Sequence, residues 1–329
     1  MNILVDHHHG ALLRSMYYLF KKRLNHKVYI PTGFEWLDYD QLYSCYPHRE
    51  TANQMLNSWV CDSKFESMFS EMRLDEFINT DIDIIVASLF ENYILFDRII
   101  KKYNKKCKLI LQVGNNVQSD LINQVGVKNL LSSAYPPYVS TNIHKIFYHQ
   151  EFNTDYFKPS LNYNIKSVAN FKHIMEEDFE MILSLEKKLP DWEFKCYGAL
   201  NRDGIIHDTE IDMAESINKF GFIFHVKKDE GYGHVIHNSF ACAKPMIVNL
   251  KTAGIYNQGT YIRNTASFLY EKDFTVIDSS DGIEKVSDKL KMMADNYEFY
   301  RNNVYKKFQE VVSFENETLE INKFLENLI

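Results

Sequence analysis

The sequence predicts an α/β protein built from two Rossmann-like domains. A chain of 329 residues is long for one domain and long enough for two, each with its own core. Residues 2–30 read as strand, loop, helix and strand, which is the start of a Rossmann-like half. Residues 222–248 read as buried strand, glycine turn, helix and strand, which predicts a second such half.

The first half opens with a strand at residues 2–5, a loop at 6–10, a helix at 11–23 and a strand at 28–30. Further buried strands are expected at 82–87, 108–113 and 143–148, with a helix at 95–102. Loops at the carboxyl ends of parallel strands are the usual ligand-binding positions. Two such loops carry His7, His8, Asn115 and Asn116 as candidate ligand-contacting residues, and His9 and Gly10 lie in the first of them.

Three consecutive histidines invite a metal interpretation. Consecutive side chains point in different directions, and no cysteine or second histidine cluster is near in sequence to complete a site. Hydrogen-bonded histidines that line a ligand site, or plain loop histidines, remain as alternatives. We therefore expect no bound metal.

Two other stretches of the first half are open to a functional or a structural interpretation. Aromatic residues between 36 and 79 could line an acceptor surface or pack within a local insertion. The five lysines between residues 101 and 108 could form an anionic contact surface or a solvated helix end.

The second half is centred on the turn at residues 230–234. Gly231 and Gly233 flank Tyr232, so the backbone can bend sharply and approach a ligand closely. The helix expected at 234–243 would offer free N–H groups and the positive end of its dipole to an anion. Glu230 would place a carboxylate beside whatever this turn holds. Around this core we expect strands at 165–169 and 192–198, and helices at 212–220, 283–294, 297–312 and 317–329.

This stretch resembles the donor-site signature of GT-B glycosyltransferases. The retaining group that includes glycogen, sucrose and cell-envelope sugar transferases carries E-G-[FY]-G-x-x-x-x-E-A-x-A-x-G-x-P. Here the segment runs from Glu230-Gly231-Tyr232-Gly233 to Pro245, with Asn238 in place of the second glutamate and Ala243 in place of the late glycine. Residues 152–159 resemble a second family segment, G-V-D-x-x-x-F-x-P, which leads from the first domain into the second.

The resemblance implies two Rossmann-like domains facing a cleft. It implies an acceptor-side domain at residues 1–150, a linker at 151–164, a nucleotide-sugar domain at 165–312, and a helix at 313–329 that packs back on the first domain. It also implies a nucleotide-sugar-dependent enzyme that transfers a sugar, with retention and without a metal, from a UDP-sugar to a hydroxyl. The UDP-sugar would be a co-substrate, and no further cofactor is expected. By the same resemblance, the candidate catalytic residues are His9 and Glu230, and the candidate acceptor-side residues are His7, His8, Asn115 and Asn116. The candidate donor-binding residues are Gly10, Lys172, Tyr197, Lys227, Glu230, Gly231, Tyr232, Gly233, His234 and Asn238.

One departure from the family concerns the donor diphosphate. Relatives place Gly-Arg and a lysine after the first strand of the second domain, whereas here residues 169–172 read Ala-Asn-Phe-Lys. Lys172 could substitute as a point charge, with Lys227, Lys228 and Arg202 as further candidates.

Composition limits the partners. The net charge of −7 argues against a general nucleic-acid binder. Residues 1–150 hold 16 of the 37 basic and 15 of the 44 acidic residues, which leaves 21 against 29 in the remainder. A polyanionic partner would therefore meet the first half. Five cysteines without a C-x-x-C pair, no signal peptide and no apolar run of about 20 residues predict a cytoplasmic protein.

Three functions remain open from the sequence. The leading one is transfer of a sugar to a glycan or a small hydroxyl compound. The second is glycosylation of hydroxymethylated pyrimidine bases in DNA, as phage-type enzymes do after flipping the base. The third is a nucleotide-sugar-binding protein without transfer activity, which Asn238 and the missing arginine suggest.

Overall fold

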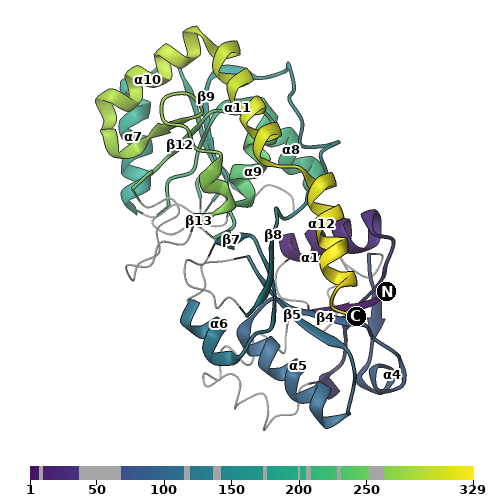
Figure 1. The fold of residues 1–329 in the computed structure, drawn as a ribbon. Helices are drawn as coiled ribbons and strands as arrows, with labels where there is room; N and C mark the ends of the chain where they lie inside the picture. Colours follow the sequence, from purple (N-terminus) through teal and green to yellow (C-terminus); the bar gives the residue numbers. More distant parts are fainter. Residues whose placement is uncertain are drawn as a thin grey trace. The chain divides into compact units, whose positions relative to one another are not determined.

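The computed structural model describes residues 1–6, 10–36, 68–114, 119–135, 142–172, 176–198, 201–204, 209–227, 231–251 and 263–329. These residues form two compact units. Unit 1 comprises Met1–Glu151 and Phe314–Ile329, and unit 2 comprises Phe152–Ser313. Figure 1 labels the helices and strands of both. No helix in the described ranges combines the length and the apolar character that a membrane crossing needs.

Unit 1 contains a parallel sheet with the strand order β3-β2-β1-β4-β5-β6-β8 in its described residues. Its strands are rich in β-branched and aliphatic residues, as expected for strands covered on both faces. The strands are β1 (Asn2–Val5), β2 (Lys27–Pro31), β3 (Ser70–Met72), β4 (Ile84–Ala87), β5 (Lys108–Val113), β6 (Asn129–Ser132), β8 (His144–Phe147) and the short β7 (Ala134–Tyr135). The helices are α1 (Gly10–Met16) with its π-helical continuation η1 (Tyr17–Arg23), the 3₁₀ turn η2 (Phe34–Trp36), α4 (Leu74–Asn79), α5 (Phe90–Lys102), α6 (Ser119–Val125) and α12 (Phe314–Glu326).

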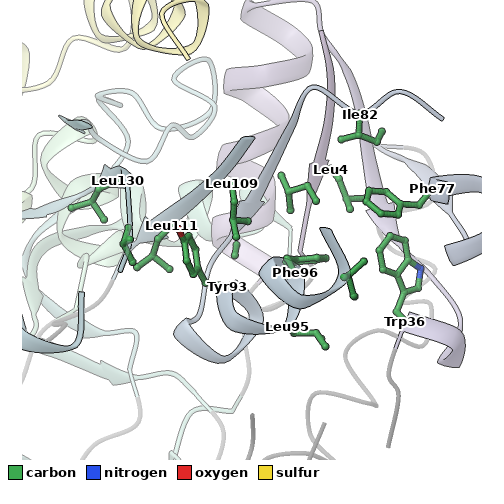
Figure 2. Packing of buried hydrophobic residues seen from close by; sticks show 14 of the residues in the cluster. Leu4, Trp36, Phe77, Ile82, Tyr93, Leu95, Phe96, Leu109, Leu111 and Leu130 are labelled. Carbon is green, nitrogen blue, oxygen red and sulfur yellow. The ribbon is translucent and has the colours of Figure 1, made fainter. Parts of the chain in front are cut away.

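Alternate residues of these strands point to opposite faces of the sheet and build two cores. On one face, Leu4 and Leu111 pack with Phe96 of α5, and Trp36 lies against Phe77 with ring centroids 5.1 Å apart. Figure 2 shows this aromatic and aliphatic cluster. The indole Nε1–H of Trp36 donates to the Met72 carbonyl at 3.0 Å, so the buried ring keeps its hydrogen bond.

The opposite face of unit 1 is covered by helices from both ends of the chain. Phe20 of η1 packs with Val5 and Val86 of the sheet, and Ile321 and Leu325 of α12 join the same core. The C-terminal helix therefore belongs to the core of unit 1, although almost the whole chain separates it from β1 in sequence.

Unit 2 contains a parallel sheet with the order β10-β9-β11-β12-β14 in its described residues. Phe222 and Phe224 point to a face covered by α7 and α10, while α8, α9 and α11 lie on the other side (Figure 1). The strands are β9 (Asn164–Asn170), β10 (Glu193–Cys196), β11 (Phe220–Phe224), β12 (Met246–Val248), β14 (Val276–Asp278) and the short β13 (Arg263–Asn264). The helices are α7 (Glu176–Lys188), α8 (Glu210–Lys219), α9 (His234–Ala241), α10 (Ile283–Asp295) and α11 (Tyr297–Val311), with 3₁₀ turns η4 (Thr265–Phe268) and η5 (Ser279–Asp281).

The segment of unit 2 that precedes β9 packs against other parts of the same unit. Phe152 and Phe157 are buried and meet edge to face, with ring centroids 5.3 Å apart. The ring of Tyr163 lies 5.1 Å from that of Tyr297, which begins α11. In this structure, residues 152–164 thus contribute apolar side chains to unit 2.

Most elements expected from the sequence are confirmed, with shifts at their ends. The strands at 2–5 and 108–113 keep their predicted bounds, whereas α5 begins at Phe90, five residues before the predicted start. The strands β3, β6 and β14, the two-residue strands β7 and β13, and the helices α4, α6 and α7 had no counterpart among the expected elements. The two parallel sheets, each with helices, confirm the α/β class.

Candidate functional site

The strand order of unit 2 marks a binding position at the carboxyl ends of β9 and β11. The chain leaves β9 toward β10 on one side and reaches β11 on the other, so helices diverge between these two strands. Asn170 of β9 pairs in register with Phe224 of β11, which places the segments after both strands at one edge. In an open parallel sheet, ligands bind in the crevice outside such a switch point.

The glycine turn leads from this edge into α9. Gly233 has φ 80° and ψ 53°, a left-handed conformation that favours glycine. Its carbonyl accepts the N–H groups of Ile236 and His237 at 3.0 and 3.1 Å and closes the first turn of the helix. Helix geometry leaves the earlier N–H groups without intrahelical acceptors, and the dipole adds positive potential there. The predicted glycine turn and the helix that follows it are therefore formed.

Tyr232 and His237 fix the shape of this turn. The Tyr232 side chain is 3% exposed, and its ring stacks on His237 with centroids 4.2 Å apart. The His237 Nδ1 lies 2.9 Å from the Gly233 carbonyl oxygen, so Nδ1 carries the proton and donates it. The His237 Nε2 lies 3.3 Å from the Thr265 hydroxyl. His234, another candidate, meets the edge of Tyr232 at 4.7 Å.

Asn238 lies one turn further along α9, on the helix that the glycine turn begins. Its side chain is half-buried, and its Oδ1 is buried without a hydrogen-bond partner among the described residues. A buried carboxamide oxygen without a donor is costly, because burial removes its water without replacing it. Asn238 thus retains the capacity to accept one hydrogen bond.

The loops after β9 and β10 are joined by carboxamide hydrogen bonds. Asn170 and Asn201 both donate through Nδ2 to the Lys172 carbonyl, at 2.5 and 2.8 Å, and Asn201 also donates to the Tyr197 carbonyl at 2.7 Å. The ring of Tyr197 stacks on Phe171 with centroids 5.6 Å apart. Lys172 and Tyr197, separated by 24 residues of chain, are brought together in this way.

The candidate cations differ in their surroundings. The Lys172 ammonium lies 2.7 Å from the Asp178 carboxylate, and its side chain is 8% exposed. Arg202 is paired with Glu186 and Asp203, and the Glu186 carboxylate raises the pKa of Arg202 above its ordinary value. Lys227 is half-buried in the segment that follows β11. Lys172 and Arg202 therefore have carboxylate partners within unit 2.

Unit 1 has a switch point of its own, between β1 and β4. Asp6, the residue after β1, is buried there. Its Oδ2 accepts the Ser88 backbone N–H at 2.7 Å and the Asn92 Nδ2 at 2.8 Å, and its Oδ1 accepts the Ser88 hydroxyl. Sequence analysis did not single out Asp6, although an acidic residue at the end of a buried first strand is a recognisable signal. Gly10 begins α1 four residues later.

Seven candidate residues lie outside the described residues: His7, His8, His9, Asn115, Asn116, Lys228 and Glu230. Within the described ranges, no group of three or more His, Cys, Asp or Glu side chains has an arrangement that could hold a metal ion. The described candidates of unit 2 gather at the carboxyl edge of one sheet: Lys172, Tyr197, Lys227, Gly231, Tyr232, Gly233, His234 and Asn238.

The chain is similar in fold to several solved structures over almost its whole length. Anabaena HepE in complex with UDP-glucose is 9% identical, with a TM-score of 0.65 over 99% of this chain and 100% of HepE. A glycosyltransferase from Rickettsia africae is 10% identical, with a TM-score of 0.64 over 99% and 98% of the two chains. An α-glucosyltransferase in complex with UDP and a 13-mer DNA containing an HMU base is 10% identical, with a TM-score of 0.62 over 99% of both chains.

The chain has the GT-B fold. This likeness extends over the full length of the GT-B structures compared, so both Rossmann-like domains of the fold are present. At 9–10% identity the likeness establishes the fold alone. No protein-family model and no curated protein sequence matches the chain.

Proposed function

We propose that this protein is a glycosyltransferase that moves a sugar from a UDP-sugar to a hydroxyl group. The observation that carries the proposal is the glycine turn of α9 at the switch point of unit 2, in a fold shared with structures that bind UDP or UDP-glucose. Residues 165–312 would hold the donor, and residues 1–150 would take the acceptor. We also propose, from the sequence, that the enzyme is cytoplasmic.

The chemistry requires stabilisation of a departing diphosphate. As the glycosidic bond breaks, the anomeric carbon becomes electron-poor and negative charge accumulates on the phosphate oxygens. The N–H groups at the start of α9 are fixed donors for that charge and need no reorganisation during the reaction. This group of donors supports a reaction without a metal.

We assign the donor contacts as follows. Glu230 would accept hydrogen bonds from sugar hydroxyls, as the resemblance implies. The unpartnered Oδ1 of Asn238 supports a contact with a ribose hydroxyl, which would supply the missing donor. Lys172 and Lys227 are the candidate cations for the diphosphate, and the Lys172 ammonium is held by Asp178 at 2.7 Å. Tyr197 and His234 would border the donor, and His9 would act on the acceptor side with His7, His8, Asn115 and Asn116.

Calorimetric titration of the full chain with UDP-glucose, UDP and GDP tests donor binding. The hydrolysis of UDP-glucose, followed by UDP release, tests transfer to water in the absence of an acceptor. The proposal expects binding of UDP and UDP-glucose and slow release of UDP. Binding without any release, with every acceptor offered, would favour a non-catalytic nucleotide-sugar-binding protein. Absence of binding to any nucleotide would contradict both.

DNA is the second acceptor class that a specific observation supports. The α-glucosyltransferase with the same fold was solved with DNA containing an HMU base. In unit 1, α5 ends in Lys101 and Lys102, and further lysines follow before β5. Two of these lysines already have partners in unit 1. Lys101 pairs with Asp97, and the Lys105 ammonium donates to the Thr80 carbonyl at 2.8 Å. Lysines at this position could contact phosphates.

Incubation with UDP-glucose and a duplex containing one hydroxymethylated pyrimidine separates DNA from a glycan acceptor. DNA glycosylation would appear as a mass increase of one hexose on the modified strand. Duplex affinity should then fall steeply between about 50 and 200 mM salt, because bound counterions are released from the phosphates. If the strand stays unmodified and the affinity for the duplex does not depend on salt, DNA is excluded as the acceptor. A glycan or a small hydroxyl compound then remains.

A further inference from the structure

A pocket of about 380 Å³ lies on unit 2 between α8 and the segment that precedes β9. One wall is a single face of α8, formed by Ile211, Ala214, Glu215 and Asn218 at spacings of three and four residues. The facing wall comes from residues 155–162. The volume falls in the range of about 300–1,000 Å³ that small-molecule sites occupy.

This pocket is separate from the glycine turn and its neighbouring loops. Asn218 and Lys219 line it and directly precede β11, and Asn162 lines it two residues before β9 begins. These residues therefore lie near the amino ends of both strands, whereas the candidate donor loops follow their carboxyl ends. The seven residues of β9 span about 20 Å of extended chain between the two edges.

Both walls are held in place by hydrogen bonds of unit 2. The Asn218 Nδ2 donates to the Lys158 carbonyl at 3.1 Å and ties α8 to the facing segment. The Asn218 carbonyl accepts the buried Lys244 ammonium at 3.1 Å. Arg301 of α11 donates through Nη2 to the Ser160 carbonyl at 2.8 Å. A ligand would therefore meet a preformed pocket and would not have to order these walls.

The lining combines apolar surface with many hydrogen-bonding groups. Tyr156 is 41% exposed and Ile211 is 44% exposed, so both side chains offer apolar surface to a ligand in the pocket. Around them, the carboxylates of Asp155 and Glu215 are acceptors, and the carboxamide of Asn162 is both donor and acceptor. Such a mixture matches a sugar, whose C–H face stacks on a ring while its hydroxyls bond to carboxylates and amides.

The charge of the lining distinguishes among ligands. Asp155 and Glu215 contribute two negative charges and Lys219 contributes one positive charge, while Arg301 behind the Ser160 wall is paired with Glu298. A phosphate or a carboxylate would meet net repulsion there, so a nucleotide or a sugar phosphate is disfavoured. We propose that this pocket is a second binding site of unit 2, for a neutral saccharide. The site goes beyond the proposed transfer reaction, because it would bind sugar whether or not the glycine turn binds a nucleotide.

Saturation-transfer NMR on the full chain tests the site with maltotriose, cellotriose and the N-acetylglucosamine trimer as neutral probes. Glucosamine and glucose 1-phosphate serve as cationic and anionic probes. At least one neutral probe should bind. Tyr156→Ala should weaken that binding by about tenfold, the loss expected for one stacking contact. Phe299→Ala, which truncates an aromatic side chain 55% exposed on α11 and outside the pocket, should leave it unchanged.

Three results would overturn the proposal. In the first, no neutral probe binds. In the second, a neutral probe binds and Tyr156→Ala leaves its affinity unchanged. In the third, the chain prefers glucosamine and Glu215→Gln abolishes that preference, which would indicate a cation site. UDP titration of the same variants separates this inference from the proposed function. Tyr156→Ala should bind UDP like the unaltered chain, so loss of saccharide binding and loss of donor binding are distinguishable.

Discussion

The ring of Tyr232 lies flat against the imidazole of His237, with 3° between the two planes. One residue belongs to the glycine turn and the other to the first turn of α9, and the same imidazole bonds to the Gly233 carbonyl. The orientation of the helix start therefore depends on this contact. An aromatic stack and a buried hydrogen bond together contribute about 2 kcal/mol to such a turn.

Tyr232→Ala should weaken UDP affinity by about tenfold and lower the free energy of unfolding by about 3 kcal/mol, because a buried ring is lost and the turn loosens. Calorimetric titration and chemical denaturation measure the two effects. Tyr232→Phe is the matched control, since it keeps the stack and removes only the hydroxyl. If Tyr232→Ala bound UDP like the control, the turn would have no part in donor binding.

Lys244 is fully buried, and its ammonium lies 4.4 Å from the centre of the Tyr163 ring. Burial lowers the pKa of Lys244 to about 7, and the nearby Arg301 acts in the same direction. Between that value and the ordinary lysine pKa of about 10.4, the unfolded chain keeps a proton that the native chain has released. Stability contributed by this group therefore rises with pH, by up to about 1.4 kcal/mol per pH unit.

Denaturation of the full chain at pH 7 and pH 9 should show this rise, and Lys244→Met should remove most of it. Met fills a similar volume and carries no charge, so the variant is expected to be at least as stable at pH 7. Lys251→Met, which alters an exposed lysine, is the control and should keep the pH dependence. Equal pH slopes for the two variants would contradict the lowered pKa.

Gly221 lies in β11 where the register with β9 shifts between Phe220 and Phe222. A Cβ at this position would lie 2.3 Å from the Ile165 carbonyl oxygen, and backbone cannot yield as a flexible side chain can. Gly221→Ala should therefore destabilise unit 2 by about 3 kcal/mol or more, or prevent its folding. Gly126→Ala meets no atom within 4 Å but has φ 72°, so it should cost only about 1 kcal/mol. Thermal unfolding compares the two.

Glu317 of α12 is bonded to His149 at the end of the unit 1 sheet. Its Oε2 accepts the backbone N–H at 2.6 Å, and its Oε1 accepts the ring Nδ1–H at 2.7 Å. Glu317→Ala should cost about 2 kcal/mol, because hydrogen bonds to a carboxylate are among the stronger ones. Hydrogen exchange should show faster opening of α12. Glu315→Ala, at an exposed position of the same helix, should have little effect.

The local pattern of the sequence was sufficient for most of the parallel strands and for the start of α9. Runs such as Ile84–Ala87 and Lys108–Val113 have the aliphatic content of strands buried on both faces. The paired glycines around Tyr232 predicted the turn, because only glycine enters the left-handed region without strain. Short or strongly charged elements escaped prediction. β3 has three residues with one apolar side chain, and α7 has six acidic or basic residues among its first and last turns.

The sequence by itself thus determined the α/β class and the helix start that could hold an anion. Periodicity and glycine position act over a few residues, so no distant contact was needed to read them. Only the tertiary structure decided that Lys172 pairs with Asp178, that Asn238 has an unpartnered oxygen and that Lys244 is buried. Each of these depends on which residues far apart in sequence become neighbours. Burial, pairing and pKa follow from that packing and have no signature in the local pattern.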